Sequence, residues 1–225
     1  MRTGNIVKLS ALKSKMLNLP LLIITAVMLI TSPLASDAKE VNRDIDLVIQ
    51  ITSDMLKGEM PFKYYDKLTG GYKYLLDNGV SYTNAHYQHS TTFTAVGHAV
   101  LSTGAPAAEH GLAGNDWADR VTGERMYCIM DASSKHLESS SLKGTSPRNL
   151  TATTISDEIK LSNGGKPKVF GIGIKDRGAI IPAGRLGKAI YYNPGTGNFI
   201  TSDYYYDQMP DWLVSFNKSG AKDLI

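Results

Sequence analysis

The sequence predicts an α/β fold with a mostly parallel central sheet flanked by helices, because strand-like and helix-like segments alternate along the chain. Residues 46–53 (DLVIQITS) and 168–174 (KVFGIGI) are rich in β-branched and apolar residues, which is typical of buried strands. Helical patterns cover residues 72–78, the stretch from Thr94 to about Gly104, and residues 153–161. These segments together favour a layered α/β architecture.

The remaining segments complete this expected order of elements. Residues 80–84 alternate in polarity, which predicts another strand, and Gly79 is placed to end the helix before it. The stretch 128–149 is rich in Ser, Lys and Gly and predicts a surface excursion. Residues 163–165 (NGG) close the helix at 153–161, and a Pro-Gly-Thr-Gly turn between 189–193 and 198–201 predicts a hairpin.

The first 38 residues have the order of parts that defines a secretory signal peptide. Four basic residues precede an apolar run at 19–30, and small residues with a Ser-Asp-Ala site at 36–38 follow it. The apolar run is shorter than the roughly 20 residues of a comfortable membrane span. We therefore expect residues 1–38 to be a signal peptide and residues 39–225 to form one exported domain, periplasmic or at the cell surface.

Composition narrows the function classes only a little. The 225-residue chain has a formal net charge of +3, part of which comes from the basic residues of the expected signal peptide, so charge gives no support for nucleic-acid binding. Cys128 is the one cysteine, which excludes an intrachain disulfide. We expect no membrane association once the signal peptide is removed.

Four polar residues occur where an open α/β sheet places its ligands, beyond the carboxyl ends of strands or at a helix start. Asp54 follows the first expected strand, and Lys175 with Arg177 follows the segment 168–174. Thr94 begins a helix, where free N–H groups favour negative charge. Each has an ordinary structural alternative: a helix cap for Thr94, a turn for Asp54 and a solvated charged turn for residues 175–177. The five histidines show no metal-binding spacing and are interpreted as structural.

A family resemblance favours the functional interpretation. Residues 92–99 (TFTAVGHA) resemble the Thr-x-Thr-x-x-Gly-His-Ala block of bacterial alkaline phosphatases that use a threonine nucleophile. Residues 102–104 (STG) and 109–117 (EHGLAGNDW) resemble the stretch that follows this block in the same enzymes. From about residue 45 to 217, the chain resembles the N-terminal part of the alkaline phosphatase superfamily, which implies an alkaline-phosphatase-like core that is incomplete here.

The resemblance implies a role for each matching residue. Thr94 matches the nucleophile, which forms a phosphothreonine intermediate and also contacts a zinc ion, and Asp54 matches an aspartate ligand of that ion. Asn115 matches an asparagine that hydrogen-bonds a phosphate oxygen. Lys175 and Arg177 match a pair that binds the other phosphoryl oxygens. The implied activity is zinc-dependent hydrolysis of small phosphate monoesters, with two zinc ions bound in the full-length enzyme.

The resemblance also limits what this chain is expected to do alone. Asp54 and Thr94 are two ligands, whereas a stable zinc site uses about four. We therefore expect an N-terminal portion of a longer enzyme, inactive by itself or nearly so. Two alternatives stay open: a phosphodiesterase or nucleotide pyrophosphatase of the same superfamily, and a non-catalytic exported fragment. The sequence gives neither the physiological substrate nor the oligomeric state.

The expected signal peptide leads to a first prediction. Protein recovered from the exported fraction should begin at or near Lys39, because cleavage would follow the small residues at 36–38. N-terminal sequencing of that fraction is the measurement. A chain that still begins at Met1 would contradict a cleaved signal peptide.

Overall fold

The computed structural model describes residues 45–138 and 143–220. The chain divides into two units, Met1–Thr52 and Ser53–Ile225, and the elements below belong to the second. The expected signal peptide lies outside the described residues. Among the described residues, no helix is both long enough and apolar enough to span a membrane.

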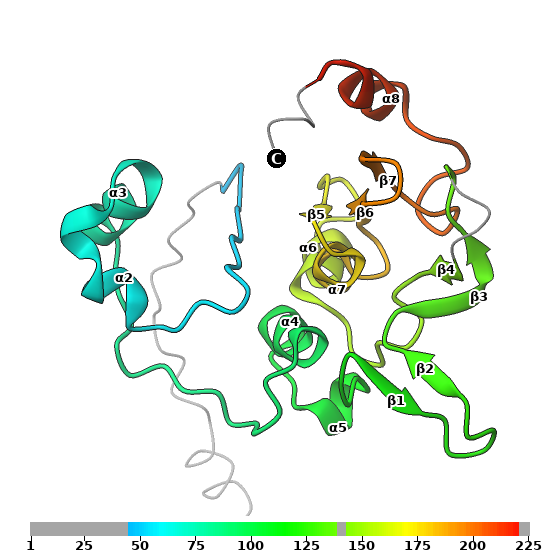
Figure 1. Cartoon of the computed structure of the whole chain (residues 1–225), viewed down its shortest axis with the longest axis horizontal. Coiled ribbons are helices and arrows are strands. Elements are labelled where there is room, and N and C mark those ends of the chain that lie inside the picture. Colours follow the sequence, from blue (N-terminus) through cyan, green and yellow to red (C-terminus); the bar gives the residue numbers. More distant parts are fainter. Residues whose placement is uncertain (1–44, 139–142, 221–225) are drawn as a thin grey trace, which may run out of the picture. The chain divides into compact units, whose positions relative to one another are not determined.

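The fold is mixed α/β, as predicted (Figure 1). The helices are α2 (Met60–Lys63), a 3₁₀ turn (Tyr65–Lys67), α3 (Gly70–Asn78), α4 (Thr94–Thr103), α5 (Ala107–His110), α6 (Ile155–Ser162), α7 (Asp176–Ala183) and α8 (Asp211–Lys218). The strands are β1 (Asp116–Ala118), β2 (Arg125–Tyr127), β3 (Met130–Lys135), β4 (Lys143–Thr145), β5 (Phe170–Gly173), β6 (Lys188–Asn193) and β7 (Asn198–Ile200).

The strands form three small sheets in the described part of the chain. β5 pairs with β6 in parallel, and β7 extends this sheet as the antiparallel partner of β6. β1–β2 and β3–β4 are separate antiparallel pairs. The parallel arrangement expected from the alternation of elements is therefore found at β5–β6, where helix α7 makes the crossover.

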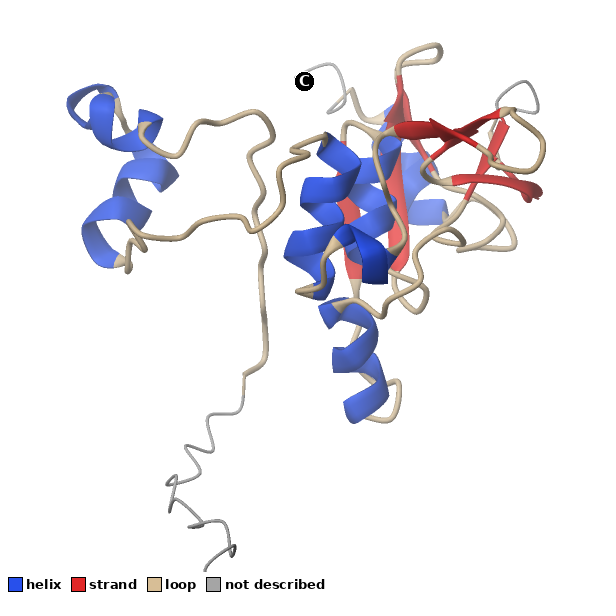
Figure 2. Cartoon of the chain, turned by 90° about the horizontal axis from the view of Figure 1, so that it is seen from below, coloured by secondary structure: helices blue, strands red, loops and turns tan. Residues whose placement is uncertain are grey.

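Helix α7 packs closely on β5 because that strand contains Gly171. A Cβ atom at Gly171 would collide with the Ala179 carbonyl oxygen, so only glycine admits the helix at this distance. Helix α4 packs on the other side of α7, and α6 also contacts α7 (Figures 1 and 2). The glycine spacing in 168–174, which fits no nucleotide-binding motif, is thus explained by packing.

The core lies between these helices and the sheet. Its buried members come from the helices, the sheet and the loops: Ala95, Ala99, Leu112, Cys128, Ile129, Leu150, Ala179, Ile180, Ile181, Ala183, Ala189, Tyr191, Ile200 and Tyr205. The opposite face of the sheet buries Ile190 and Phe199 against Leu213 of α8. Helices therefore cover one face of the sheet and part of the other, where Phe170 and Ile172 of β5 stay exposed.

Two buried polar residues of this region, Thr154 and Asp157, are hydrogen-bonded within the fold. Thr154 caps α6 by accepting a hydrogen bond from the Asp157 backbone N–H, and the Asp157 carboxylate accepts one from the Thr154 N–H in return. The other oxygen of Asp157 accepts bonds from the backbone N–H groups of Arg185 and Leu186, each at 2.8 Å. This carboxylate therefore joins the start of α6 to the turn after α7.

Several predicted elements are confirmed. Helix α4 begins at Thr94 and ends at Gly104, whose φ of 68° is the left-handed conformation that glycine tolerates best. Helix α3 covers the predicted 72–78, although Gly79 ends it in an extended conformation. Helix α6 and the β6–β7 hairpin also lie where the sequence predicts them.

Two predicted strands are wrong. Residues 46–53 and 80–84 form no strand and are exposed, Val80 and Tyr82 by about four-fifths of their surface. A strand forms only where its backbone N–H and C=O groups have a neighbouring chain to bond, and no described segment pairs with either run. Apolar composition alone is therefore insufficient here.

The predicted surface excursion at 128–149 is also wrong in large part. Strands β3 and β4 occupy it, and Asp131, Ser134, Thr145 and Ser146 are buried. Ser146 donates a hydrogen bond to the Asp131 carboxylate at 2.7 Å, and Ser134 donates one to Asp203 at 2.7 Å. Serine composition indicated solvent exposure, but these hydroxyls are paired inside the fold.

The buried thiol and phenol groups of the core predict a loss of stability at high pH. Burial raises the pKa of the Cys128 thiol and of the Tyr191 phenol, each to about 12. Both groups ionise earlier in the unfolded chain, near about 8.5 for cysteine and 10 for tyrosine. The stability that the two buried groups contribute is fully present below these pKa values of the unfolded chain. It is lost as pH rises through the pKa values of the folded protein, so the unfolding free energy should fall between about pH 9 and 12.

Urea denaturation across this range is the measurement. Tyr191→Phe removes one of these ionising groups, so its stability should fall less steeply between about pH 10 and 12, by up to roughly 1.4 kcal/mol per pH unit. An identical pH dependence in wild type and variant would show that Tyr191 is not protected from ionisation by burial.

Candidate phosphate-binding site

Thr94 is the first residue of α4, and its hydroxyl is not used to cap the helix. The capping position belongs to Phe93, and no side-chain capping bond exists at this end. The Thr94 side chain is half-buried. The capping alternative considered from the sequence is therefore wrong, and the hydroxyl is available at a helix N-terminus.

Asn115 lies beside this helix start. Its side-chain carbonyl accepts a hydrogen bond from the Ala95 backbone N–H at 2.9 Å, one residue after Thr94. Because the Ala95 N–H can only donate, the amide oxygen of Asn115 must face it, and the amide NH₂ group remains as a donor. The Asn115 backbone carbonyl accepts a bond from the Cys128 N–H at 3.0 Å, which fixes the residue to the β1–β2 hairpin.

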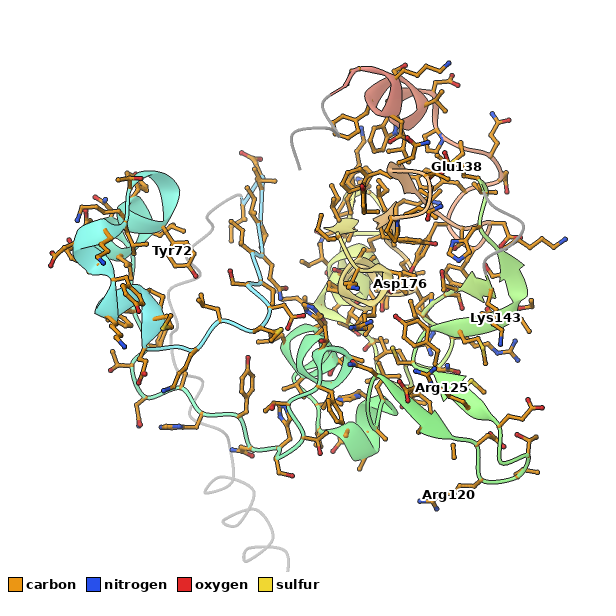
Figure 3. All side chains as sticks on the ribbon, in the orientation of Figure 1. Tyr72, Arg120, Arg125, Glu138, Lys143 and Asp176 are labelled. Atoms are coloured by element: carbon orange, nitrogen blue, oxygen red, sulfur yellow. The ribbon has the colours of Figure 1, made fainter. Side chains whose placement is uncertain are left out.

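Arg177 lies in the first turn of α7 with one edge of its guanidinium held. Its Nη1 donates to the Tyr127 hydroxyl at 3.0 Å, and that hydroxyl donates to Asp176 Oδ1 at 2.7 Å. Asp176, the first residue of α7, is labelled in Figure 3. Arg177 Nε is buried and has no partner among the described residues. Burial opposes the charge of Arg177, but the bond to Tyr127 and the nearby Asp176 outweigh it, so the pKa is raised.

Lys175 differs from Arg177 in its surroundings. It is the residue before α7, its side chain is exposed, and it caps the helix with no side-chain bond. Asp176 and Arg177 are half-buried and bonded to Tyr127. The interpretation of 175–177 as a solvated charged turn is therefore wrong for two of its three residues.

His98 follows Thr94 by one helical turn and is only 8% exposed. Burial lowers its pKa, the Asp54 carboxylate opposes this effect and Arg177 adds to it. His98 therefore lies within electrostatic range of both residues, and a Cβ at Gly178 would lie 3.4 Å from its Nε2. The i, i+4 spacing from Thr94 was the sequence signal for this position, and the sequence interpretation treated it as structural.

Asp54 lies in a turn instead of at the end of a strand. It is exposed, and its Oδ1 accepts a hydrogen bond from the Met55 N–H at 3.0 Å. Met55 has a φ of 60°, a conformation that non-glycine residues seldom adopt. The turn interpretation of Asp54 is thus confirmed, and its electrostatic effect on His98 places it in range of α4.

The described residues do not by themselves fit a zinc ion. No cluster of three or more His, Cys, Asp or Glu side chains in 45–138 and 143–220 could hold a metal. Asp54 and Thr94 would supply two oxygen donors, about half of what a zinc site needs. A surface cavity of about 460 Å³, lined by residues 206–211, contains none of the residues described above.

Sequence comparison identifies the relatives of this chain. The type I phosphodiesterase / nucleotide pyrophosphatase model matches residues 48–212. A protein named calcium-transporting ATPase from Myroides odoratus is 40% identical over 180 residues, which is 79% of this chain and 33% of that protein. Alkaline phosphatase PafA from Elizabethkingia meningoseptica is 37% identical over 179 residues, 78% of this chain and 33% of PafA.

Structural comparison agrees with the sequence relatives. The crystal structure of wild-type PafA matches with a TM-score of 0.70 and 39% identity, over 73% of this chain and 32% of that one. A PafA variant in which a threonine, an asparagine, a lysine and an arginine are replaced matches with a TM-score of 0.71 and 36% identity, over 75% of this chain and 33% of the variant.

The chain spans about a third of the length of the curated relatives that it matches. Its match to the family model nevertheless covers most of the described residues, from the exposed run before Asp54 to the start of α8. The chain belongs to the type I phosphodiesterase / nucleotide pyrophosphatase family.

Proposed function

We propose that this chain carries the nucleophile and part of the phosphoryl-binding site of a phosphate monoester hydrolase, an alkaline phosphatase. The observation that carries the proposal is the buried, unpartnered Nε of Arg177. Leaving a buried donor without an acceptor costs about 1–3 kcal/mol, and more for a charged group. A phosphoryl group suits such an edge, because two of its oxygens can accept two parallel hydrogen bonds from a guanidinium.

The neighbouring groups suit the same ligand. The free amide NH₂ of Asn115 can donate to a second phosphoryl oxygen, and the Thr94 hydroxyl lies at the helix start to which Asn115 is bonded. The N–H groups of α4 favour negative charge at that point. Thr94 would therefore meet a phosphoryl group that Asn115 and Arg177 hold.

The proposed reaction has two steps. The Thr94 oxygen attacks phosphorus, the new O–P bond forms as the ester P–O bond breaks, and the proton of the Thr94 hydroxyl leaves with the alcohol. Water then attacks the phosphothreonine, its oxygen bonds to phosphorus as the Thr94 O–P bond breaks, and one of its protons restores the Thr94 hydroxyl as inorganic phosphate is released. The covalent intermediate divides one difficult displacement into two easier ones.

Two zinc ions, with Asp54 and Thr94 as donors to one of them, remain a prediction. The described residues provide too few donors to hold a zinc ion by themselves, so the remaining ligands would have to come from elsewhere in the whole enzyme. Metal analysis of the purified whole protein tests this prediction.

Export to the periplasm or cell surface is also proposed, and it rests on the expected signal peptide alone.

The relatives support the choice of residues. The replaced threonine and asparagine of the PafA variant are separated by as many residues as Thr94 and Asn115. The replaced lysine and arginine are separated by as many residues as Lys175 and Arg177. The name alkaline phosphatase of PafA favours monoester hydrolysis, whereas the family description keeps diester or pyrophosphate hydrolysis as the alternative.

Monoester and diester substrates separate these alternatives in the whole enzyme. A monoester dianion carries more charge on its non-bridging oxygens, so Arg177→Ala should lower kcat/KM for an aryl monoester by roughly 10²–10³. The loss on the methyl diester should be much smaller. Lys175→Ala should show the same preference with a smaller loss, because Lys175 is exposed.

Thr94→Ala is the matched control, since removal of the nucleophile should damage hydrolysis of both substrates severely. Equal losses on monoester and diester in the Arg177 and Lys175 variants would refute the monoester assignment and favour the phosphodiesterase.

Asn115 variants separate its structural role from its proposed binding role. Asn115→Ala loses the acceptor for the Ala95 N–H and should destabilise the fold by about 1 kcal/mol. Asn115→Asp keeps an acceptor there and adds a charge that a helix N-terminus tolerates well, so its stability should stay near wild type. Asn115→Asp should nevertheless bind inorganic phosphate poorly, because it loses the amide donor and repels the anion.

Urea denaturation and calorimetric titration with inorganic phosphate are the two measurements. Phosphate binding by Asn115→Asp at wild-type strength would exclude Asn115 as a phosphate ligand.

A further inference from the structure

The Tyr127 hydroxyl lies between two charged groups of opposite sign. It donates its one hydrogen to Asp176 Oδ1 at 2.7 Å and accepts a hydrogen bond from Arg177 Nη1 at 3.0 Å. A phenol has a single O–H to donate. Donation to Asp176 therefore leaves only its lone pairs for Arg177, and the direction of both bonds is fixed.

We propose that Tyr127 is a positioning residue that orients the Arg177 guanidinium toward the phosphoryl group, an inference that rests on the proposed function of Arg177. The guanidinium is planar, so a bond at Nη1 sets the direction of its other edge. That edge consists of Nε and Nη2, and Nε is the buried donor without a partner among the described residues. Tyr127 thus leaves the edge formed by Nε and Nη2 to donate two hydrogen bonds to a ligand.

Tyr127 also takes the place of a direct ion pair between Asp176 and Arg177. None of the ion pairs among the described residues joins Asp176 to Arg177, although the two are adjacent in α7. Asp176 Oδ1 instead accepts the Tyr127 hydroxyl and, at 2.8 Å, the Arg177 backbone N–H. The hydroxyl bonds to both the carboxylate and the guanidinium, so the Nε edge of Arg177 is left for a phosphate dianion instead of for Asp176.

The backbone around Tyr127 links Arg177 to Asn115. Tyr127 ends β2 and pairs with Asp116 of β1, the residue that follows Asn115. The next residue, Cys128, donates its N–H to the Asn115 carbonyl at 3.0 Å. One hairpin therefore carries both the Asn115 amide and the hydroxyl that holds Arg177, which fixes the two phosphate donors relative to each other.

The surroundings of Tyr127 favour the protonated form of its hydroxyl. Burial raises the pKa of Tyr127, and the Asp176 carboxylate adds to the rise, as does Cys128 weakly, while the bond from Arg177 opposes it. An unperturbed tyrosine ionises near about pH 10. An ionised Tyr127 would pair with Arg177 and reduce its attraction for phosphate, so burial preserves the arrangement where a free phenol would lose it.

Tyr127→Phe tests this role because it removes the hydroxyl and keeps the ring. In the whole enzyme, we expect the affinity for inorganic phosphate to fall about 10- to 30-fold, within the range for a misplaced catalytic contact. kcat/KM for an aryl monoester should fall more than kcat/KM for its methyl diester. Arg177→Ala should show the larger loss on both measures.

Tyr191→Phe is the matched control. Tyr191 is another buried tyrosine whose hydroxyl bonds to neighbours, here Thr145 and His136, at 3.0 Å each. It should change thermal stability by a similar amount and leave phosphate affinity and the monoester preference unchanged.

A double-mutant cycle separates this proposal from the function on which it rests. If Tyr127 acts through Arg177, Tyr127→Phe should weaken phosphate binding no further when Arg177 is already alanine. An equal loss in both backgrounds, or wild-type affinity in Tyr127→Phe, would overturn the positioning role while leaving the role of Arg177 intact. Wild-type phosphate affinity in Arg177→Ala would overturn the proposed function itself, and the positioning role with it.

Discussion

The close contact between helices α4 and α7 is the constraint on which the rest of this structure depends. Fully buried alanines lie on both helices, Ala95 and Ala99 on α4 and Ala179 and Ala183 on α7, and a Cβ at Gly178 of α7 would lie 3.4 Å from His98 of α4. Small residues of this kind let two helix backbones approach closely, and Gly171 lets α7 lie close to β5. Larger residues at these positions would separate the helices and move both N-termini. The start of α4 carries Thr94, and the start of α7 carries Arg177, so the packing of the core determines how the candidate site is assembled.

The β1–β2 hairpin adds the second constraint, because it bonds to both helices. Asn115 binds the backbone of α4 through Ala95, and Tyr127 binds Asp176 and Arg177 of α7. Each bond uses one part of a side chain that has two hydrogen-bonding parts. The Asn115 oxygen and Arg177 Nη1 are bonded, whereas the Arg177 Nε has no partner among the described residues and the Asn115 NH₂ stays available as a donor. Both remaining donors suit an anion.

Local sequence patterns predicted the elements whose stability is itself local. Helix α4 with its terminal glycine, α6 with its Thr154 cap and the β6–β7 hairpin follow from capping and turn residues that act within a few positions. The run at 46–53 was wrongly predicted as a strand because strand formation depends on a partner that composition does not reveal. The buried serines of β3–β4 were missed for a similar reason, since their partners lie elsewhere in the sequence.

The residues of the candidate site also fall into two groups, those that the sequence predicted and those that it did not. Thr94, Asn115, Lys175 and Arg177 could be named because family motifs carry them, whereas Tyr127 and Asp176 could not. Their contact joins residues 49 positions apart, and neither belongs to a recognisable pattern. His98 could have been found from its one-turn spacing to Thr94, but spacing alone does not distinguish a site residue from a buried one. Long-range contacts of this kind require the fold.

A crystal structure of the whole enzyme with bound orthovanadate tests the central claim most directly, because vanadate takes the geometry of a phosphoryl group under attack. We expect the anion at the start of α4, facing the Thr94 hydroxyl, with hydrogen bonds from the Asn115 NH₂ and from the Nε edge of Arg177. An anion bound elsewhere, or a protein carboxylate occupying the Nε edge of Arg177, would contradict the assignment of these residues as a phosphoryl-binding site.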